Sequence, residues 1–130
     1  MALDATEEIV RAICSDKFDG ERYSPSLFKG ENTSVSRLSV IPLEEHWDLF
    51  QKNVQVPPER ILVQIGQIHI GAMQRVGEEH LTKLQLTVEP DPLDWNPGHA
   101  VMPQNISKGL SKKITKKMEK HSIPTHLQKA

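Results

Sequence analysis

The chain has 130 residues, of which 37% are hydrophobic and 25% are charged, and its formal net charge is −1. These values are typical of one globular domain, and they exclude a largely disordered chain or two substantial cores. A single cysteine, Cys14, excludes an internal disulfide and favours a reducing compartment. Without a signal-peptide pattern or an apolar stretch long enough for a membrane span, we expect a cytoplasmic protein with one domain over residues 1–130.

The first half of the chain predicts helices and strands in turn. Residues 4–14 are expected to form a helix, with Asp4 as its N-cap and a run of apolar side chains on one face. Residues 15–33 are rich in Asp, Gly, Ser and Pro, which indicates a long connection. The alternation of polar and apolar residues over 34–40 predicts a half-buried strand, and a helix is expected to begin at Pro42.

The second half gives a less uniform pattern. Residues 61–65 predict a strand, but residues 66–76 fit the face of a helix and also continue the β pattern, so both readings stay open. Strict alternation predicts a strand over residues 84–88. The proline-rich segment 89–98 is expected to be irregular, because proline removes ladder donors. Residues 99–102 predict a short strand before Pro103.

Residues 105–121 are expected to form a basic amphipathic C-terminal helix, followed by a frayed tail over residues 122–130. Its apolar stripe, which we expect to pack on the sheet or on a second copy of the chain in a homodimer, comprises Ile106, Leu110, Ile114 and Met118. Its basic face comprises Lys108, Lys112, Lys113, Lys116, Lys117 and Lys120. Seven lysines stand against one acid in residues 101–130, whereas residues 1–100 carry 16 acidic and 9 basic side chains. This polarity indicates an anionic partner or docking between oppositely charged faces.

The elements together predict an α/β (α+β) fold. We expect a small mixed or antiparallel sheet of three to five strands with helices packed on it. The six histidines have no metal-ligand spacing, and the motifs of nucleotide-binding loops and hydrolase elbows are absent. No metal and no cofactor are therefore expected, and Cys14 is expected to be a small buried hydrophobe rather than a catalytic thiol.

One polar cluster combines two arginines with several serines on a loop and the strand after it. Guanidinium and hydroxyl groups are typical of phosphate and carboxylate sites. The alternative is that the serines start turns and the arginines pair with nearby acids. The cluster comprises Arg22, Ser24, Ser26, Ser34, Ser36 and Arg37.

A second cluster lies in the proline-rich loop. His99 is a candidate general base with a carboxylate to orient it. The alternative is a turn at residues 96–98 with His99 in a structural hydrogen bond. We expect Arg22 or Arg37 to lie near His99 in a common pocket, because functional groups of small domains gather on loops. The cluster comprises Asp91, Asp94, Trp95, Asn96 and His99.

Three ordered blocks of sequence resemble a family of small uncharacterised bacterial proteins. They are R-x-S-P-S-x-F at residues 22–28, S-V-x-R at 34–37, and D-P followed by N-P-x-H-A at 91–100. The resemblance implies a bacterial origin but no activity. It also implies that the residues to examine first are Arg22, Ser24, Ser26, Arg37, Asn96 and His99.

The function that the sequence favours is a non-catalytic binding or accessory module for an anionic ligand. That ligand is a nucleotide, a nucleic-acid backbone contacted weakly and without sequence specificity, or an acidic protein surface. One alternative is a small transferase or hydrolase acting on a nucleotide-like substrate, with Arg22 or Arg37 binding phosphate and His99 as acid or base. Another alternative is a protein partner of the antitoxin or immunity type.

Overall fold

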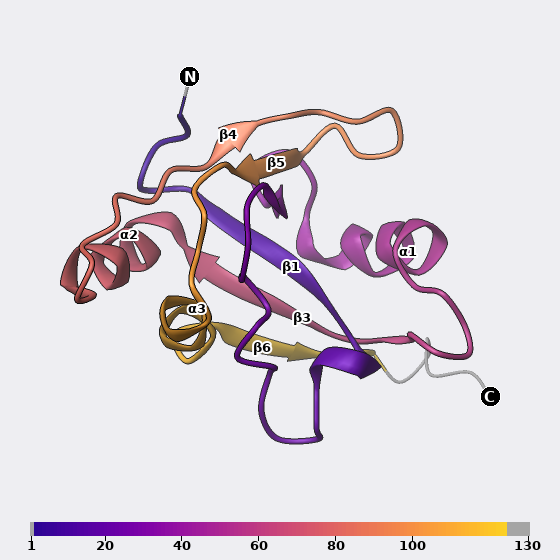
Figure 1. The fold of residues 1–130 in the computed structure, drawn as a ribbon. Helices are drawn as coiled ribbons and strands as arrows, with labels where there is room; N and C mark the ends of the chain where they lie inside the picture. Colours follow the sequence, from indigo (N-terminus) through magenta and orange to yellow (C-terminus); the bar gives the residue numbers. More distant parts are fainter. Residues whose placement is uncertain (1, 125–130) are drawn as a thin grey trace.

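Six antiparallel strands form one sheet in the computed structural model, which describes residues 2–124 (Figure 1). The strand order is β4-β5-β2-β1-β3-β6. The strands are β1 (Glu8–Cys14), β2 (Thr33–Arg37), β3 (Leu62–His69), β4 (Glu89–Pro90), β5 (His99–Met102) and β6 (Glu119–Ser122). The helices are α1 (Leu43–Asn53), α2 (Ile70–Glu79) and α3 (Lys108–Thr115), with a 3₁₀ turn, η1, at Ser15–Lys17.

Both faces of the sheet are covered, so the central strand β1 is buried on two sides. Ile9 and Ile13 face a core shared with α2 and α3, whereas Val10 and Cys14 face a smaller core against α1. Figure 1 shows α1 apart from the other two helices, with β1 and β3 running between them. No helix among residues 2–124 is long and apolar enough to cross a membrane.

The prediction of a helix over residues 4–14 is wrong, since β1 occupies most of this segment. A central strand that is buried on both faces has a continuous apolar run, which sequence alone does not separate from a helix. Asp4 does not cap a helix. Its carboxylate accepts hydrogen bonds from the backbone N–H and the hydroxyl of Thr6, both at 2.9 Å, and so closes a turn before the strand.

Residues 66–76 adopt both of the predicted conformations in succession. β3 continues to His69, paired with β1, and α2 begins at the next residue. The change is fixed by His69, whose Nδ1 accepts a hydrogen bond from the backbone N–H of Ala72 at 3.3 Å and so caps the helix. The strands predicted at residues 34–40 and 99–102, and the helix after Pro42, are confirmed.

The strand predicted over residues 84–88 is not formed, although Leu86 and Val88 are fully buried. Its backbone partners are scattered: the Leu3 N–H donates to the Val88 carbonyl at 2.7 Å, and the Thr87 N–H donates to Oε1 of Gln104 at 3.0 Å. The alternating pattern therefore arises because one side of the segment is buried. The segment forms no continuous ladder with a neighbouring strand. The strand β4 begins directly after it, so the prediction of an irregular segment over residues 89–98 is wrong for its first two residues.

The C-terminal helix predicted over residues 105–121 is also wrong in extent. Ser107 caps α3, which ends at Thr115, and β6 then pairs with β3. With β6 and β1, neither of which is predicted as a strand, the sheet has six strands, more than the predicted three to five. The apolar stripe at 106, 110, 114 and 118 is nevertheless buried. The predicted tail begins at Ser122, but Ser122 lies in β6. Residues 125–130 of that tail lie outside the described part of the chain.

The close packing of α2 makes Gly77 a test of the fold. A Cβ atom there would lie 2.5 Å from the carbonyl oxygen of Leu84 and 3.1 Å from Cγ of Leu86. Gly77→Ala is therefore expected to lower the free energy of unfolding by about 1–3 kcal/mol. Gly109→Ala is the matched control, because the nearest atom there, Cε1 of His80, is 3.8 Å away. It should raise stability by about 0.4–1 kcal/mol. Urea denaturation measures both changes, and a stabilising Gly77→Ala would contradict the packing described.

Candidate functional site

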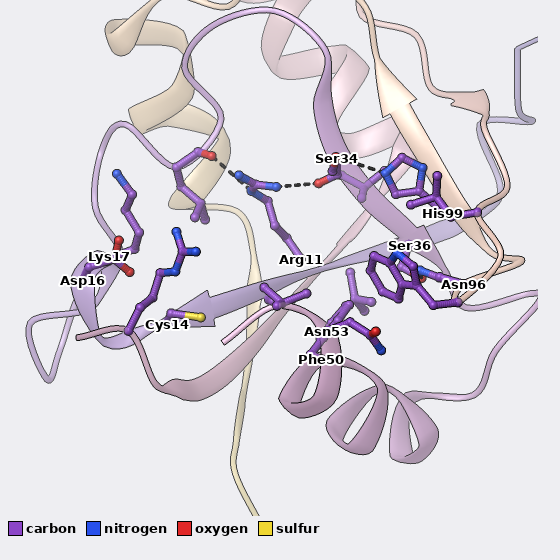
Figure 2. Close-up of a pocket in the computed structure, with 18 residues that line it drawn as sticks. Arg11, Cys14, Asp16, Lys17, Ser34, Ser36, Phe50, Asn53, Asn96 and His99 are labelled. Carbon is purple, nitrogen blue, oxygen red and sulfur yellow. Dashed lines mark hydrogen bonds between the residues drawn. The ribbon is translucent and has the colours of Figure 1, made fainter. Parts of the chain in front are cut away.

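A pocket of about 400 Å³ opens where β1 and β2 separate (Figure 2). The two strands pair at Ile9 with Arg37 and at Val10 with Ser36, and their described residues form no further pairs beyond this point. The walls come from both strands, from α1 and from the loop before β5. A cavity of this volume is within the range that holds small-molecule ligands.

Arg11 extends from β1 into this opening and bridges the separated segments (Figure 2). Its Nε donates a hydrogen bond to the carbonyl oxygen of Leu27 at 3.1 Å, and its Nη1 donates to the carbonyl oxygen of Ser34. The guanidinium carbon lies 5.8 Å from the ring centroid of Phe28. Burial lowers the pKa of Arg11 to about 10, so the group stays charged at neutral pH. Among residues 2–124, no carboxylate forms an ion pair with Arg11.

The charges that line the pocket are mainly positive. Arg11, Lys17 and Arg60 stand against the single carboxylate of Asp16. In Figure 2, Lys17 and Asp16 lie at one end of the pocket and His99 at the other, with Arg11 between them. The pocket therefore offers a field that attracts anions.

Apolar side chains complete the lining. Phe50 and Val54 belong to α1 and to the residue that ends it, and Leu93 and Trp95 come from the loop before β5. Phe50 is buried, while the Trp95 side chain is exposed at the edge of the pocket. A ligand with an apolar or aromatic body would bury surface here, because such contacts contribute most of the affinity in concave sites.

Cys14 also lines the pocket, but its chemistry is weak. Burial raises the pKa of its thiol, and the carboxylate of Asp16 adds to the rise. The thiolate is the reactive form, so a protonated thiol is a poor nucleophile. The geometry thus agrees with a small buried hydrophobe at this position.

His99 is held by hydrogen bonds at both ring nitrogens. Its Nδ1 lies 2.7 Å from the carbonyl oxygen of Asp91, and its Nε2 lies 3.0 Å from Oγ of Ser34. A carbonyl oxygen can only accept, so Nδ1 carries the proton of the neutral ring and Nε2 accepts from the Ser34 hydroxyl. The Asp91 carboxylate lies 3.4 Å from Nδ1, where it would stabilise a positive charge on the ring.

His46 forms a second, fully buried network with Ser36 and Asn96. Its Nδ1 donates to the Pro42 carbonyl at 3.0 Å, and its Nε2 accepts from the Ser36 hydroxyl at 2.6 Å. The same Ser36 oxygen accepts from Nδ2 of Asn96 at 3.0 Å, and Oδ1 of Asn96 accepts from the Gly98 N–H at 2.9 Å. Ser36 and Asn96 line the pocket, but these bonds already use their polar atoms. Their role is to hold the pocket wall in shape.

This buried network predicts a pH dependence of stability. Burial lowers the pKa of His46 below its ordinary value of 6.5. The unfolded chain therefore binds more protons than the folded one below pH 6.5, and the free energy of unfolding should fall as the pH falls through this value. Urea denaturation at about pH 7.5 and pH 5.5 measures the loss. His46→Gln should show a smaller loss than the original protein, and an equal loss would contradict the assignment.

The two arginines singled out in the sequence do not share a pocket with His99. Arg37 follows Ser36 on β2 and so points to the other face of the sheet. Its Nε and Nη2 donate to the two carboxylate oxygens of Glu7 at 3.1 and 3.0 Å. Arg22 lines a different cavity. The predicted convergence of Arg22 or Arg37 with His99 is therefore wrong, and Arg11 lies where they were expected.

The second cavity, of about 810 Å³, joins two features that the sequence keeps apart. The segment after η1 meets the end of α3 and the strand β6, so the first cluster meets part of the basic face. We call this cavity the basic groove, and its polar lining includes Arg22, Ser24, Lys112, Lys116 and Lys120.

The other residues of those two clusters have separate environments. The Ser26 hydroxyl lies 2.8 Å from that of Ser24 and outside the lining of the groove. Nζ of Lys113 bonds to Nδ1 of His80 at 3.0 Å. Lys108 and Lys117 are exposed. The basic face is divided in this way because α3 is shorter than predicted.

Comparisons with known proteins give no relative from which a function can be read. No protein-family model matches the sequence, and no curated protein or solved structure matches it. The resemblance to a bacterial family therefore stays a prediction, and the geometry and charge of the pocket are the remaining indications of function.

Proposed function

We propose that this protein binds a small anionic ligand in the pocket between β1 and β2. The observation that carries the proposal is the guanidinium of Arg11, a partly buried cation that no carboxylate of residues 2–124 neutralises. Cations removed from water are nearly always paired in folded proteins, because desolvation is costly. A bound carboxylate or phosphate would supply the missing charge.

The arrangement of Arg11 leaves room for such a contact. Nε and Nη1 are occupied by backbone carbonyls, whereas Nη2 forms no hydrogen bond to the described residues. Guanidinium groups bind carboxylate and phosphate oxygens with strong, charge-assisted hydrogen bonds. Lys17 and Arg60 line the same pocket and add to the attraction. The apolar lining at Phe50 favours a ligand with a hydrocarbon or aromatic part beside its charge.

A panel of matched anionic and neutral compounds tests the proposal. Glutarate, phenyl phosphate and AMP carry the charge, and glutaramide, phenol and adenosine are their neutral counterparts. Ligands that bind only the folded state raise its melting temperature with concentration. We expect at least one anion to do so, with its neutral counterpart inactive. No rise with any anion up to about 10 mM, or equal rises within each pair, would contradict the proposal.

The alternative of an enzyme that uses Arg22 or Arg37 with His99 receives no support from this geometry. The Arg37 guanidinium is engaged by Glu7, and Arg22 lines the basic groove. A reacting group cannot be held by side chains that do not reach a common cavity.

A second candidate function, weak contact with a nucleic-acid backbone, is favoured by the basic groove. Four lysines and Arg22 line this cavity, whereas its two aromatic residues are a buried Tyr23 and a Phe18 that packs edge-on against it. We expect duplex DNA to bind weakly and its affinity to fall steeply between about 50 and 200 mM salt. Lys112→Ala combined with Lys116→Ala should make this salt dependence shallower. Tight, salt-resistant and sequence-selective binding would contradict the expectation.

A further inference from the structure

We propose that the pocket also hydrolyses its ligands when they are esters or thioesters, with Ser34 as nucleophile and His99 as general base. The proposal rests on the proposed function, because the same pocket has to hold the substrate. It depends on one arrangement: a hydroxyl that faces the pocket, a histidine nitrogen 3.0 Å away, and a group that fixes the proton on the other nitrogen.

The register of the sheet places these two side chains together. His99 is paired with Ser36 across β2 and β5, so its side chain points to the same face as Ser36 and Ser34. The ring reaches diagonally to Ser34, two residues along the strand. Figure 2 shows the Ser34 and His99 side chains directed toward each other at one end of the pocket, with Arg11 close to Ser34.

Comparison with the second serine–histidine pair shows what distinguishes this one. Ser36 and His46 make the same kind of hydrogen bond, but they are 1% and 0% exposed, and the Ser36 oxygen also accepts a hydrogen bond from Asn96. Ser34 is exposed and lines the cavity. Ser34 therefore has the access to substrate that a nucleophile needs, and the Ser36–His46 pair does not.

The reaction needs no group beyond the chain and water. The Ser34 oxygen forms a bond to the carbonyl carbon of the substrate as its proton moves to Nε2 of His99. The bond from that carbon to the leaving oxygen or sulfur then breaks, and the leaving group takes the proton from His99. Water attacks the acyl–serine, His99 accepts a proton from it, and the serine oxygen regains this proton as the carboxylic acid departs.

Two neighbouring groups support the charges that form. The Asp91 carboxylate, 3.4 Å from Nδ1, faces the ring when it becomes an imidazolium. Arg11 donates a hydrogen bond to the backbone carbonyl of Ser34, so its guanidinium lies against the residue that carries the reacting hydroxyl. A preorganised cation at this place stabilises the oxyanion of the tetrahedral intermediate. Lys17 lines the opposite end of the pocket and adds to the attraction for an anionic acyl group.

The test uses the full chain with 4-nitrophenyl acetate and the anionic 4-nitrophenyl hydrogen glutarate. We expect a burst of nitrophenolate close to one per chain and a higher kcat/KM for the anionic ester. Ser34→Ala and His99→Gln should each lower kcat/KM by about 10²- to 10⁴-fold. Ser39→Ala, whose hydroxyl bonds to Glu7 away from the pocket, is the control and should keep the rate. A fluorophosphonate probe should label Ser34, as shown by mass spectrometry of the peptides.

Binding of glutarate separates failure of this inference from failure of the proposed function. If glutarate binds both the original protein and Ser34→Ala, but neither hydrolysis nor labelling depends on Ser34, the hydrolytic inference is wrong and the binding function stands. If no anion of the panel binds, the proposed function is wrong as well. Hydrolysis that survives in Ser34→Ala, or a label on another residue, would overturn the assignment of the nucleophile.

Discussion

Replacing Arg11 with methionine is expected to lower the affinity for the anions that bind the pocket by about 10- to 100-fold. Hydrogen bonds to charged groups contribute about 1.5–3 kcal/mol, and 1.4 kcal/mol corresponds to a tenfold change in affinity. Methionine keeps much of the apolar stem of the side chain, while the guanidinium is lost together with its charge and its contact with the Phe28 ring. Isothermal titration at constant ionic strength measures the change.

Arg37→Met is the matched control for this experiment. It removes a guanidinium from the neighbouring strand and breaks its two hydrogen bonds to Glu7, but Arg37 does not line the pocket. We expect its affinity for the anions to equal that of the original protein. An Arg11→Met protein with unchanged affinity, or an equal loss in both variants, would show that the anion does not contact Arg11.

Ile114→Ala is expected to lower the free energy of unfolding by about 2–5 kcal/mol, because truncation leaves a cavity in a packed core. Ile114 is 0% exposed, and it packs in the core that α2, α3 and the sheet share. Leu81→Ala is the control: Leu81 is 94% exposed, and its truncation should change stability by less than about 0.5 kcal/mol. Urea denaturation measures both. A loss below about 1 kcal/mol at Ile114 would mean that the helix does not depend on this packing.

The elements that the sequence predicts correctly are those with a local signal. Pro42 stands directly before α1, and the alternation over residues 34–40 marks β2. The apolar stripe from Ile106 to Met118 identifies buried positions even though the helix is shorter than its period suggests. Hydrophobic periodicity reports which side of a segment is buried, and it does so correctly when the type of element is wrong.

The errors fall where distant pairing decides the conformation. β1 is a strand because it is paired with β2 and β3, and β6 is a strand because it is paired with the other edge of β3. Residues 84–88 have the alternation of a strand but lack a neighbour to pair with. None of these partners is visible in the local sequence, since long-range contacts override local preference.

The candidate site was predictable in part. Ser36, Asn96 and His99 lie together as polar residues around one pocket, although two of them hold the wall in place. Arg11 is not among the site residues predicted from the sequence, because a basic residue within a supposed helix is ordinary. The same arginine is unusual on a central strand, where most of the residues before and after it are buried and apolar. That contrast appears only once β1 is recognised as a strand.

The claim that Arg11 and the surrounding pocket bind a small anion is tested most directly by two-dimensional ¹H–¹⁵N NMR spectra during a titration with glutarate. We expect the Nε–Hε signal of Arg11 and the amide signals of Ser34 and His99 to shift together and to saturate with one affinity. Arg11→Met should abolish these shifts. Shifts confined to Arg22, Lys112 and Lys116 would place the anion in the basic groove and contradict a binding site at Arg11.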